Sequence, residues 1–388
     1  MKKISIFGAT GSIGTSTLEV INKLPKDKFK ILGLSAHHNY KKLAECAIKS
    51  NAELAVIANE AHYTNLKSLL TGTNIKVAAG ASGMQEMCDL DNDLVVAAIV
   101  GSAGLVSTYN SIKNGTNIAL ANKESLVCGG EIIKKACIEN KVQLIPVDSE
   151  HNAIFQVLEQ HNSTAINKIL LTASGGPFRQ HTKEQLNTVT KEQALNHPNW
   201  KMGGKITIDS ASLFNKGLEL IEAHYLFDMP IEKIEIVVHP ESIIHSMVNY
   251  QDGSTLAQLA NHDMKVPITH ALYWPKRYDA STKIVNNLDF TKLTQLNFAK
   301  PDYKNFPSLN LCKEAIKIGG TAPIILNASN EIAVELFLNN KIKFMDIFKI
   351  VEHMLGIYPH HPINSIEEIV SLDKQFKIQT REFCNTLR

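Results

Sequence analysis

The sequence has few of the features that mark secreted, membrane or nucleic-acid-binding proteins. Its six cysteines are scattered over 388 residues and form no C-x-x-C pair, which argues against a disulfide framework and a structural zinc site. No apolar run approaches the roughly 20 residues that a helix needs to span a bilayer. The formal net charge is only +2, so bulk electrostatics give no reason to expect nucleic acid or a membrane surface as a partner.

The composition is that of a globular protein, with 44% apolar and 20% charged residues. A length of 388 residues suits two or three domains. Scattered thiols fit a reducing compartment. An apolar strand is predicted to start at Lys2, so we expect no signal or transit peptide and a cytoplasmic location.

Apolar strands alternate with helical patterns through the first 147 residues. The predicted strands cover residues 2–7, 29–35, 53–58, 74–79, 93–100, 117–121 and 142–147. This alternation predicts a mostly parallel, doubly wound sheet of the Rossmann-like α/β class. Ligands of such sheets bind beyond the carboxyl ends of the strands.

A glycine-rich turn follows the first predicted strand. Gly8, Gly11 and Gly14 form a G-x-x-G-x-x-G pattern that leads into a helical segment. Glycines let the backbone approach a pyrophosphate, and the helix N-terminus supplies unbonded N–H groups. The context favours dinucleotide binding, with an ordinary strand-to-helix turn as the alternative.

The end of the second predicted strand bears on the choice of cofactor. NAD enzymes usually place an acid there, whereas this chain has His37, His38 and Asn39, followed after Tyr40 by Lys41 and Lys42. Potential positive charge without an acid favours the 2′-phosphate of NADP. The alternative is a surface turn.

Two carboxylates follow the strand predicted at 142–147. Asp148 and Glu150 are two residues apart, and in extended chain such residues point to the same side. Carboxylates held that close favour a divalent cation with oxygen ligands. A solvated acidic loop is the alternative.

The next segments carry polar groups that suit an anion. Ser174 lies in a small-residue turn after the strand predicted at 168–172.

The loop 196–204 contains Trp200 and is predicted to be a lid, unless Trp200 only anchors it to the core. A further strand is predicted at 205–209.

A helical pattern over residues 213–223 places Asn215, Glu219 and Glu222 on one face. Ser210, Asn215 and Lys216 near its start suit a phosphate, and Glu219 is a candidate third metal ligand. A plain solvated face is the alternative.

We predict four segments along the chain. They are a Rossmann-like NADPH-binding domain at 1–147, an α+β catalytic domain at 148–273 with its lid loop at 196–205, a linker at 274–305 and a C-terminal helical bundle at 306–388. The catalytic domain includes a hairpin predicted at Asp252-Gly253. The bundle is predicted from helical patterns at 308–318, 327–338, 344–355 and 364–384.

Taken together, the motifs resemble those of the 1-deoxy-D-xylulose 5-phosphate reductoisomerase family over nearly the whole chain. The matching stretches include GATGSIG (8–14), LANKESLV (120–127), LIPVDSEHNAIFQ (144–156) and HPNWKMGGKITIDSASLFNKGLELIEA (197–223), and the long central blocks are far more specific than the glycine loop. The resemblance implies rearrangement and NADPH-dependent reduction of this sugar phosphate to 2-C-methyl-D-erythritol 4-phosphate. It also implies Mg²⁺, Mn²⁺ or Co²⁺ and a homodimer formed through the catalytic domain.

The resemblance also assigns roles to individual residues. The metal ligands would be Asp148, Glu150 and Glu219, which with Lys123 form the catalytic set. The substrate would contact Lys123, Ser149, Glu150, Ser174, His197, Trp200, Met202, Ser210, Asn215, Lys216 and Glu219, with Trp200 and Met202 on the lid. The cofactor would contact Gly8, Thr10, Gly11, Ser12, Ile13, Gly14, His37, His38, Asn39, Asn122, Glu124 and Gly203.

One stretch departs from the family pattern. Where the family commonly has Gly-Arg/Lys-Asn or -Ser, this chain has His37, His38 and Asn39, so the 2′-phosphate contact would pass to His38. Two other functions stay open from the residues alone. One is another NADP-dependent Rossmann oxidoreductase of the semialdehyde or homoserine dehydrogenase type, and the other is a nucleotide-sensing module without turnover.

Overall fold

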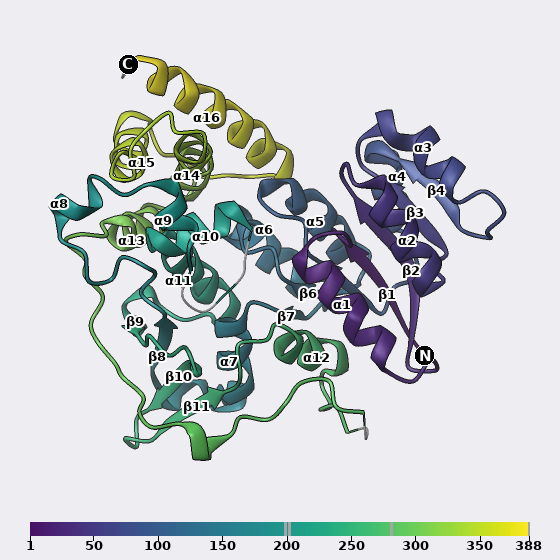
Figure 1. The fold of residues 1–388 in the computed structure, drawn as a ribbon, viewed down its shortest axis with the longest axis horizontal. Coiled ribbons are helices and arrows are strands. Elements are labelled where there is room, and N and C mark those ends of the chain that lie inside the picture. The colour runs from purple at the N-terminus through teal and green to yellow at the C-terminus, as the bar shows by residue number, and fades with distance from the viewer. Residues whose placement is uncertain (198–199, 201–202, 280–281, 387–388) are drawn as a thin grey trace. The chain divides into compact units, whose positions relative to one another are not determined.

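The computed structural model describes residues 1–197, 200, 203–279 and 282–386 (Figure 1). The chain divides into two compact units. The first holds Met1–Ser125, Ile133–Asn152 and Asp263–Asn287, and the second holds Leu126–Ile132, Ala153–His262 and Leu288–Arg388. These units differ from the predicted segments, because residues 263–287 return to the first unit and the C-terminal helices join the second. No helix within the described ranges has the length and apolar character needed to cross a membrane.

The first unit is built on a seven-stranded sheet with the order β4-β3-β2-β1-β5-β6-β7. Its strands are β1 (Lys2–Phe7), β2 (Phe29–Ala36), β3 (Leu54–Ile57), β4 (Lys76–Ala79), β5 (Leu94–Ala97), β6 (Asn117–Leu120) and β7 (Leu144–Pro146). Every neighbouring pair is parallel. β3 and β5 are buried along their whole length, as expected for apolar strands in a parallel sheet. The predicted doubly wound fold is confirmed.

Helices connect the successive strands of this sheet. They are α1 (Ser12–Lys23), α2 (Tyr40–Ser50), α3 (Tyr63–Leu69), α4 (Gly80–Cys88), α5 (Leu105–Lys113) and α6 (Glu124–Asn140), with 3₁₀ turns at Glu60–His62 and Ser102–Gly104. The strand order reverses at β1, which pairs with β2 on one side and β5 on the other. The carboxyl ends of β1 and β5 therefore flank the crevice where such sheets bind ligands.

A helix from much later in the chain completes the first unit. α12 (Lys265–Tyr273) packs against α1 and β7 (Figure 1). Lys265 forms an ion pair with Glu19 at 3.0 Å, and the Lys2 ammonium donates to the Leu272 carbonyl at 3.0 Å. This packing explains why residues 263–287 belong with the first unit.

The second unit contains a four-stranded sheet with the order β11-β10-β8-β9. Its strands are β8 (Ile166–Ala173), β9 (Ile234–Val238), β10 (Ile244–Tyr250) and β11 (Thr255–Leu259). β10 runs antiparallel to β8 and β11, while β8 and β9 are parallel. The predicted hairpin joins β10 to β11, and Gly253 has the positive φ of +88° that its turn requires.

Helices surround a phenylalanine-rich core in the second unit. They are α8 (Lys183–Leu186), α9 (Lys191–Leu195), α10 (Gly204–Ala211), α11 (Phe214–Phe227), α13 (Ser308–Ile318), α14 (Ala322–Leu338), α15 (Asp346–Ile357) and α16 (Ile366–Thr386), with α7 (Ser149–Val157) beginning in the first unit. Short 3₁₀ turns lie at Gln160–Ala165, Ile231–Lys233 and Phe290–Lys292. Phe344 meets the rings of Phe178, Phe337 and Phe348 edge to face. α14 and α13 pack on α10 and α11, so the C-terminal helices share this core.

Two local predictions are wrong. Residues 205–209 form part of helix α10 rather than a strand. Their β-branched side chains suggest a strand, but burial of Thr207 and Ile208 and an ion pair from Lys205 to Asp209 at i,i+4 support the helix. Residues 148–150 are also not extended, because α7 begins at Ser149 and places Glu150 in its first turn. An acid there is stabilised by the helix dipole.

Candidate active site

The turn between β1 and α1 has the geometry of a phosphate-binding loop. Gly8 has φ +84°, and a Cβ added there would lie 2.5 Å from the Ala98 carbonyl oxygen. A Cβ on Gly14 would lie 2.4 Å from the Gly8 carbonyl oxygen, so the turn can pass this close to α1 only with glycine. No side chain from the described ranges caps α1 at Gly11, which leaves its first N–H groups to a ligand.

The other predicted residues of this loop lie with the glycines. Ser12 and Ile13 are the first residues of α1, and the Thr10 carbonyl accepts a hydrogen bond from the Lys42 ammonium at 3.0 Å. Lys42 therefore brings positive charge to the loop, a contact that sequence reasoning missed. A glycine turn of this kind before a helix N-terminus is the usual site for the pyrophosphate of a dinucleotide.

The histidine pair after β2 belongs to a larger polar cluster. The rings of His37 and His38 lie 3.8 Å apart, and His62 lies 6.0 Å from His38. The Asn59 amide bonds His38 Nδ1 at 3.0 Å. Burial, with a smaller effect of the neighbouring imidazoles, lowers the pKa of His37 below its ordinary value. The sequence did not reveal Asn59 and His62, although they follow β3, the neighbour of β2 in the sheet.

Asn39 has a structural role beside this cluster. Its side chain caps α2 by accepting a hydrogen bond from the Lys42 amide at 3.1 Å. The cap holds the turn that presents both histidines.

The loop after β6 is held by a buried asparagine. Asn122 donates to the Gly101 carbonyl at 2.9 Å and to Glu124 Oε2 at 2.9 Å. The bond to Gly101 joins the loop after β6 to the loop after β5 at the carboxyl edge of the sheet. Asn122 and Glu124 thus lie where a ligand of the sheet would bind, and Lys123 lies between them.

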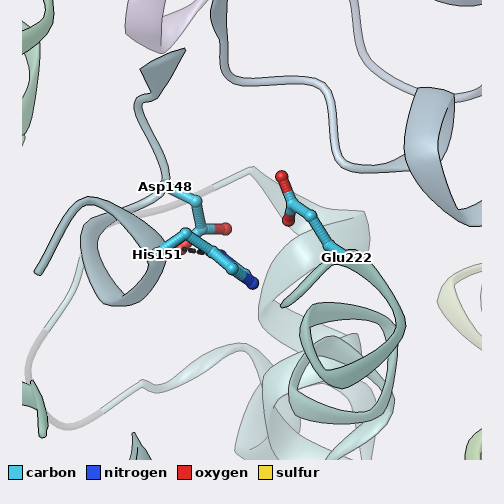
Figure 2. A group of neighbouring side chains, drawn as sticks. All are labelled: Asp148, His151 and Glu222. Carbon is cyan, nitrogen blue, oxygen red and sulfur yellow. Dashed lines mark ion pairs between the residues drawn. The ribbon is translucent and has the colours of Figure 1, made fainter. Parts of the chain in front are cut away.

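Lys123 reaches the acidic residue that follows β7. Its ammonium pairs with Asp148 Oδ2 at 2.7 Å, and His151 Nδ1 lies 3.8 Å from Asp148 Oδ1 (Figure 2). Burial raises the pKa of Asp148, but Lys123 and His151 together outweigh that effect and hold this pKa well below its ordinary value. Asp148 is therefore an anion at neutral pH. His151, three residues along on α7, was not predicted from the sequence.

Glu150 lies beside Asp148 in the same turn. Its Oε2 accepts a hydrogen bond from the Ser149 hydroxyl at 2.5 Å. The first unit thus brings together Lys123, Asp148, Ser149 and Glu150, all predicted from the sequence. Two carboxylates at the start of one helix offer oxygen donors suited to a hard divalent cation.

In the second unit, helix α11 carries a buried carboxylate. The side chain of Glu219 is 1% exposed; the Asn215 amide donates to its Oε1 and the Lys216 ammonium pairs with its Oε2. Glu222, labelled in Figure 2, is fully buried one turn further along the same helix. The predicted common face of Asn215, Glu219 and Glu222 is thus a buried polar face rather than a solvated one.

A second group in this unit surrounds the turn after β8. The Ser174 hydroxyl accepts a hydrogen bond from the Gly176 amide at 3.2 Å and lies 3.3 Å from His197 Nε2. The Trp200 amide donates to His197 Nδ1 at 3.0 Å. His197 is therefore oriented from both sides, and it joins the predicted anion turn to the predicted lid.

The backbone carbonyl of Ser210 lies close to the turn that holds Ser174 and Gly176. A Cβ on Gly176, which has φ +69°, would lie 2.8 Å from the Ser210 carbonyl oxygen. Ser174, His197 and the end of α10 are thus close together, as the predicted substrate set requires. Trp200 is partly buried, with its ring 5.6 Å from that of His262. Gly203 is the N-cap of α10, while Met202 lies outside the described residues.

A buried network behind this group was not predicted. Asp209 pairs with Lys205 on α10 and accepts a hydrogen bond from the Asn330 amide of α14 at 2.9 Å. Asp209 is 2% exposed and Asn330 is fully buried. The network fixes α10, and with it Ser210, to the central helix of the C-terminal bundle.

Known proteins match the chain over its full length. Family profiles for 1-deoxy-D-xylulose 5-phosphate reductoisomerase match residues 4–130, those for its C-terminal domain match residues 144–227, and those for the DXP reductoisomerase C-terminal domain match residues 259–379. The 1-deoxy-D-xylulose 5-phosphate reductoisomerase of Zymomonas mobilis is 48% identical and is aligned over 100% of this chain and 98% of its own. That of Clostridium tetani is 50% identical over 99% of this chain and 100% of its own.

Solved structures agree with these relatives. The Zymomonas mobilis reductoisomerase in complex with NADPH has a TM-score of 0.93 at 48% identity and covers 99% of both chains. A DOX-P reductoisomerase in complex with NADPH, fosmidomycin and magnesium has a TM-score of 0.94 at 40% identity over 100% of this chain and 99% of its own. These proteins are named as reductoisomerases, which does not favour the dehydrogenase or sensing alternatives. The chain belongs to the 1-deoxy-D-xylulose 5-phosphate reductoisomerase family.

Proposed function

We propose that this chain converts 1-deoxy-D-xylulose 5-phosphate to 2-C-methyl-D-erythritol 4-phosphate with NADPH and a divalent cation. The observation that carries the proposal is family membership over the whole chain at about 48% identity. Related structures hold NADPH, magnesium and fosmidomycin, which supports the same choice of cofactors.

The cofactor site is proposed to follow the switch point of the first sheet. The pyrophosphate lies against Gly8, Gly11 and Gly14, whose backbone leaves room for it. The histidine cluster after β2 receives the 2′-phosphate. Further along the edge of the sheet, Asn122 and Glu124 lie nearer the ribose and nicotinamide. The remaining proposed contacts are Thr10, Ser12, Ile13, Asn39 and Gly203.

The metal site is proposed to use Asp148, Glu150 and Glu219. Oxygen donors of this kind fit Mg²⁺ or Mn²⁺. A bound cation acts as a Lewis acid on a ketone and its neighbouring hydroxyl, and NADPH supplies the hydride. Lys123 holds Asp148 ionised and in place, while Ser149 orients Glu150. The ammonium of Lys123, which lies 2.7 Å from Asp148 Oδ2, is also proposed to stabilise a substrate oxygen that gains negative charge.

The phosphate end of the substrate is proposed to bind Ser174, His197, Ser210, Asn215 and Lys216. Ser174 and Ser210 offer hydroxyls, and His197 is oriented for such a role by its two hydrogen bonds. Anchoring the remote phosphate orients the reacting carbons and supplies binding energy for closing the loop that carries Trp200 and Met202.

An assay with purified protein tests this function. NADPH oxidation is followed with 1-deoxy-D-xylulose 5-phosphate, with and without added Mn²⁺ or Mg²⁺, and the product is identified by mass spectrometry. We expect oxidation only when substrate and cation are both present, with 2-C-methyl-D-erythritol 4-phosphate as product. NADPH oxidation that needs no cation, or that occurs with aspartate semialdehyde instead, would contradict the proposal.

The protein is further proposed to be a cytoplasmic homodimer. Scattered free thiols fit a reducing compartment. In the second unit β11 lies at the edge of its sheet, with Leu256 41% exposed. An exposed edge strand with an apolar side chain is a suitable surface for a second copy of the chain.

A further inference from the structure

Two side chains proposed to bind substrate contact the carboxylate proposed to bind metal. On α11, Asn215 donates to Glu219 Oε1 and Lys216 pairs with Glu219 Oε2. The spacings of four and three residues place all three side chains on one helix face. The helical spacing therefore brings both side chains to the Glu219 carboxylate.

The Lys216–Glu219 pair is almost completely removed from solvent. The side chains of Lys216 and Glu219 are 5% and 1% exposed. A buried carboxylate is costly unless a positive charge and hydrogen bonds compensate it. In the absence of a metal ion, the Lys216 ammonium provides that charge and the Asn215 amide satisfies the second oxygen.

A divalent cation on Glu219 would provide the same compensation. The ammonium and the metal ion then compete for one carboxylate, because both act on its negative charge. A Glu219–Lys216 pair is neutral and has little attraction for a substrate phosphate. With the cation bound to Glu219, the Lys216 ammonium no longer has to compensate this carboxylate and can turn to the phosphate.

We propose that Lys216 is an exchangeable counter-ion of Glu219. Metal binding displaces its ammonium, and Lys216, together with Asn215, then turns to the anionic end of the substrate. Metal and substrate anion therefore bind cooperatively, and by linkage each raises the affinity of the other equally. This inference rests on the proposed function, since it takes Glu219 as a metal ligand.

The first test measures Mn²⁺ affinity without substrate, by calorimetry, in the wild type and in Lys216→Met. Removal of the competing ammonium should tighten Mn²⁺ binding several-fold. If Lys216 instead only positions Glu219, the variant should bind Mn²⁺ more weakly, and that result would overturn the proposal. Lys168→Met is the matched control, because Lys168 pairs with Glu235 in the same unit but at the surface, and it should leave Mn²⁺ affinity unchanged.

The second test uses the unaltered protein, so it holds even if Lys216→Met fails to fold. Propylphosphonate carries the anionic end but has no ketone and hydroxyl to chelate a metal. Its affinity should rise roughly fivefold or more when Mn²⁺ is present, a typical size for coupling between sites. An affinity that is the same with and without Mn²⁺ would contradict the exchange.

Glu219→Gln separates this inference from the proposed metal site. If Mn²⁺ affinity is unchanged in Glu219→Gln, Glu219 is not a ligand and the metal site itself is wrong. If Glu219→Gln and Lys216→Met both lose Mn²⁺ affinity, the metal site stands and only the counter-ion exchange is wrong. Tighter binding in Lys216→Met with weaker binding in Glu219→Gln supports both.

Discussion

At the residue scale, the histidines after β2 are expected to make cofactor affinity depend on pH. An imidazole binds a phosphate dianion best when protonated, and its ordinary pKa is near 6.5. Burial lowers the pKa of His37, so its imidazole is mostly neutral at pH 7, and the 2′-phosphate contact is proposed for His38. We predict that the Kd for NADPH rises several-fold between pH 6.5 and 8.5, measured by fluorescence of the bound cofactor.

NADH provides the matched control for this experiment. It lacks the 2′-phosphate, so its Kd should change little over the same pH range. His38→Arg should remove the pH dependence for NADPH, because a guanidinium stays protonated throughout. A Kd for NADPH that does not vary with pH would assign the 2′-phosphate to other groups, such as Lys41.

His270 makes the stability of the first unit depend on pH. Burial, with a smaller effect of Arg277, lowers the pKa of His270 to about 4. Its Nδ1 lies 3.1 Å from the Asn152 amide, so the neutral ring fits as an acceptor. Above pH 6.5 the ring is neutral in both folded and unfolded chains. As the pH falls from 6.5 towards 4, only the unfolded chain gains the proton, so the free energy of unfolding should drop by about 2 kcal/mol.

Urea denaturation of wild type and His270→Gln at pH 7.5 and 5 measures this effect. Glutamine offers an acceptor to Asn152 but does not titrate, so the variant should lose less stability than the wild type at pH 5. Equal losses in both proteins would show that other groups cause the acid sensitivity.

At this scale the sequence predicted site residues that lie in one motif, but it did not predict the hydrogen-bond and ring partners that come from other segments of the chain. Ser149 and Glu150 are neighbours in the chain, so a single motif placed them together. Asn59 and His62 meet the histidine pair only because β3 pairs with β2, and Asn330 meets Asp209 only because α14 packs on α10. Such contacts depend on tertiary packing, which periodicity does not encode.

At the element scale, the close approach of the Ser174 turn and α10 requires a glycine. We predict that Gly176→Ala lowers the free energy of unfolding by about 1–3 kcal/mol, because its φ of +69° disfavours a side chain and the new Cβ would meet the Ser210 carbonyl. The displaced α10 should also raise the substrate KM. Thermal unfolding and steady-state kinetics measure the two effects.

Gly253→Ala is the control for backbone strain alone. Gly253 also has a positive φ, +88°, but no atom of the described chain lies within 4 Å of an added Cβ. Gly253→Ala should lower the free energy of unfolding by about 1 kcal/mol and leave the substrate KM unchanged. If both variants raise the KM equally, the contact with Ser210 has no role in substrate binding.

Most helices and strands were predicted correctly from periodicity, but residues 205–209 were assigned the wrong type. The helices at 308–318 and 344–355 were predicted because their apolar residues repeat at helical spacing. Residues 205–209 were read as a strand because Ile206, Thr207 and Ile208 are β-branched. A short run of this kind does not distinguish a strand from a buried helix, and tertiary contacts decide.

At the scale of the whole molecule, the exposed edge of the second sheet leads to a prediction about assembly. Light scattering should give twice the chain mass of 42.9 kDa. Leu256→Glu should shift the protein towards monomer, because the substitution places charge on the edge strand β11. Ser254→Glu, in the adjoining turn, is the control for added charge alone. A monomeric wild type would contradict the proposed dimer.

The division into units was the least predictable property of the molecule. Composition gave no sign that residues 263–287 belong with the first sheet rather than with the strands that precede them. The ion pair of Lys265 with Glu19 and the bond from Lys2 to Leu272 join residues far apart in sequence. Long-range pairings of this kind leave no local pattern in a single sequence.

The return of α12 to the first unit also bears on the order in which the chain can fold during synthesis. A domain usually folds once its last residue has left the ribosome. Here the seven-stranded sheet lacks α12 until residues 263–273 have emerged, after all four strands of the second sheet. The first unit is thus completed only after the whole second sheet has been synthesised, and a fragment that ends at residue 152 would expose the surface of α1 that α12 covers.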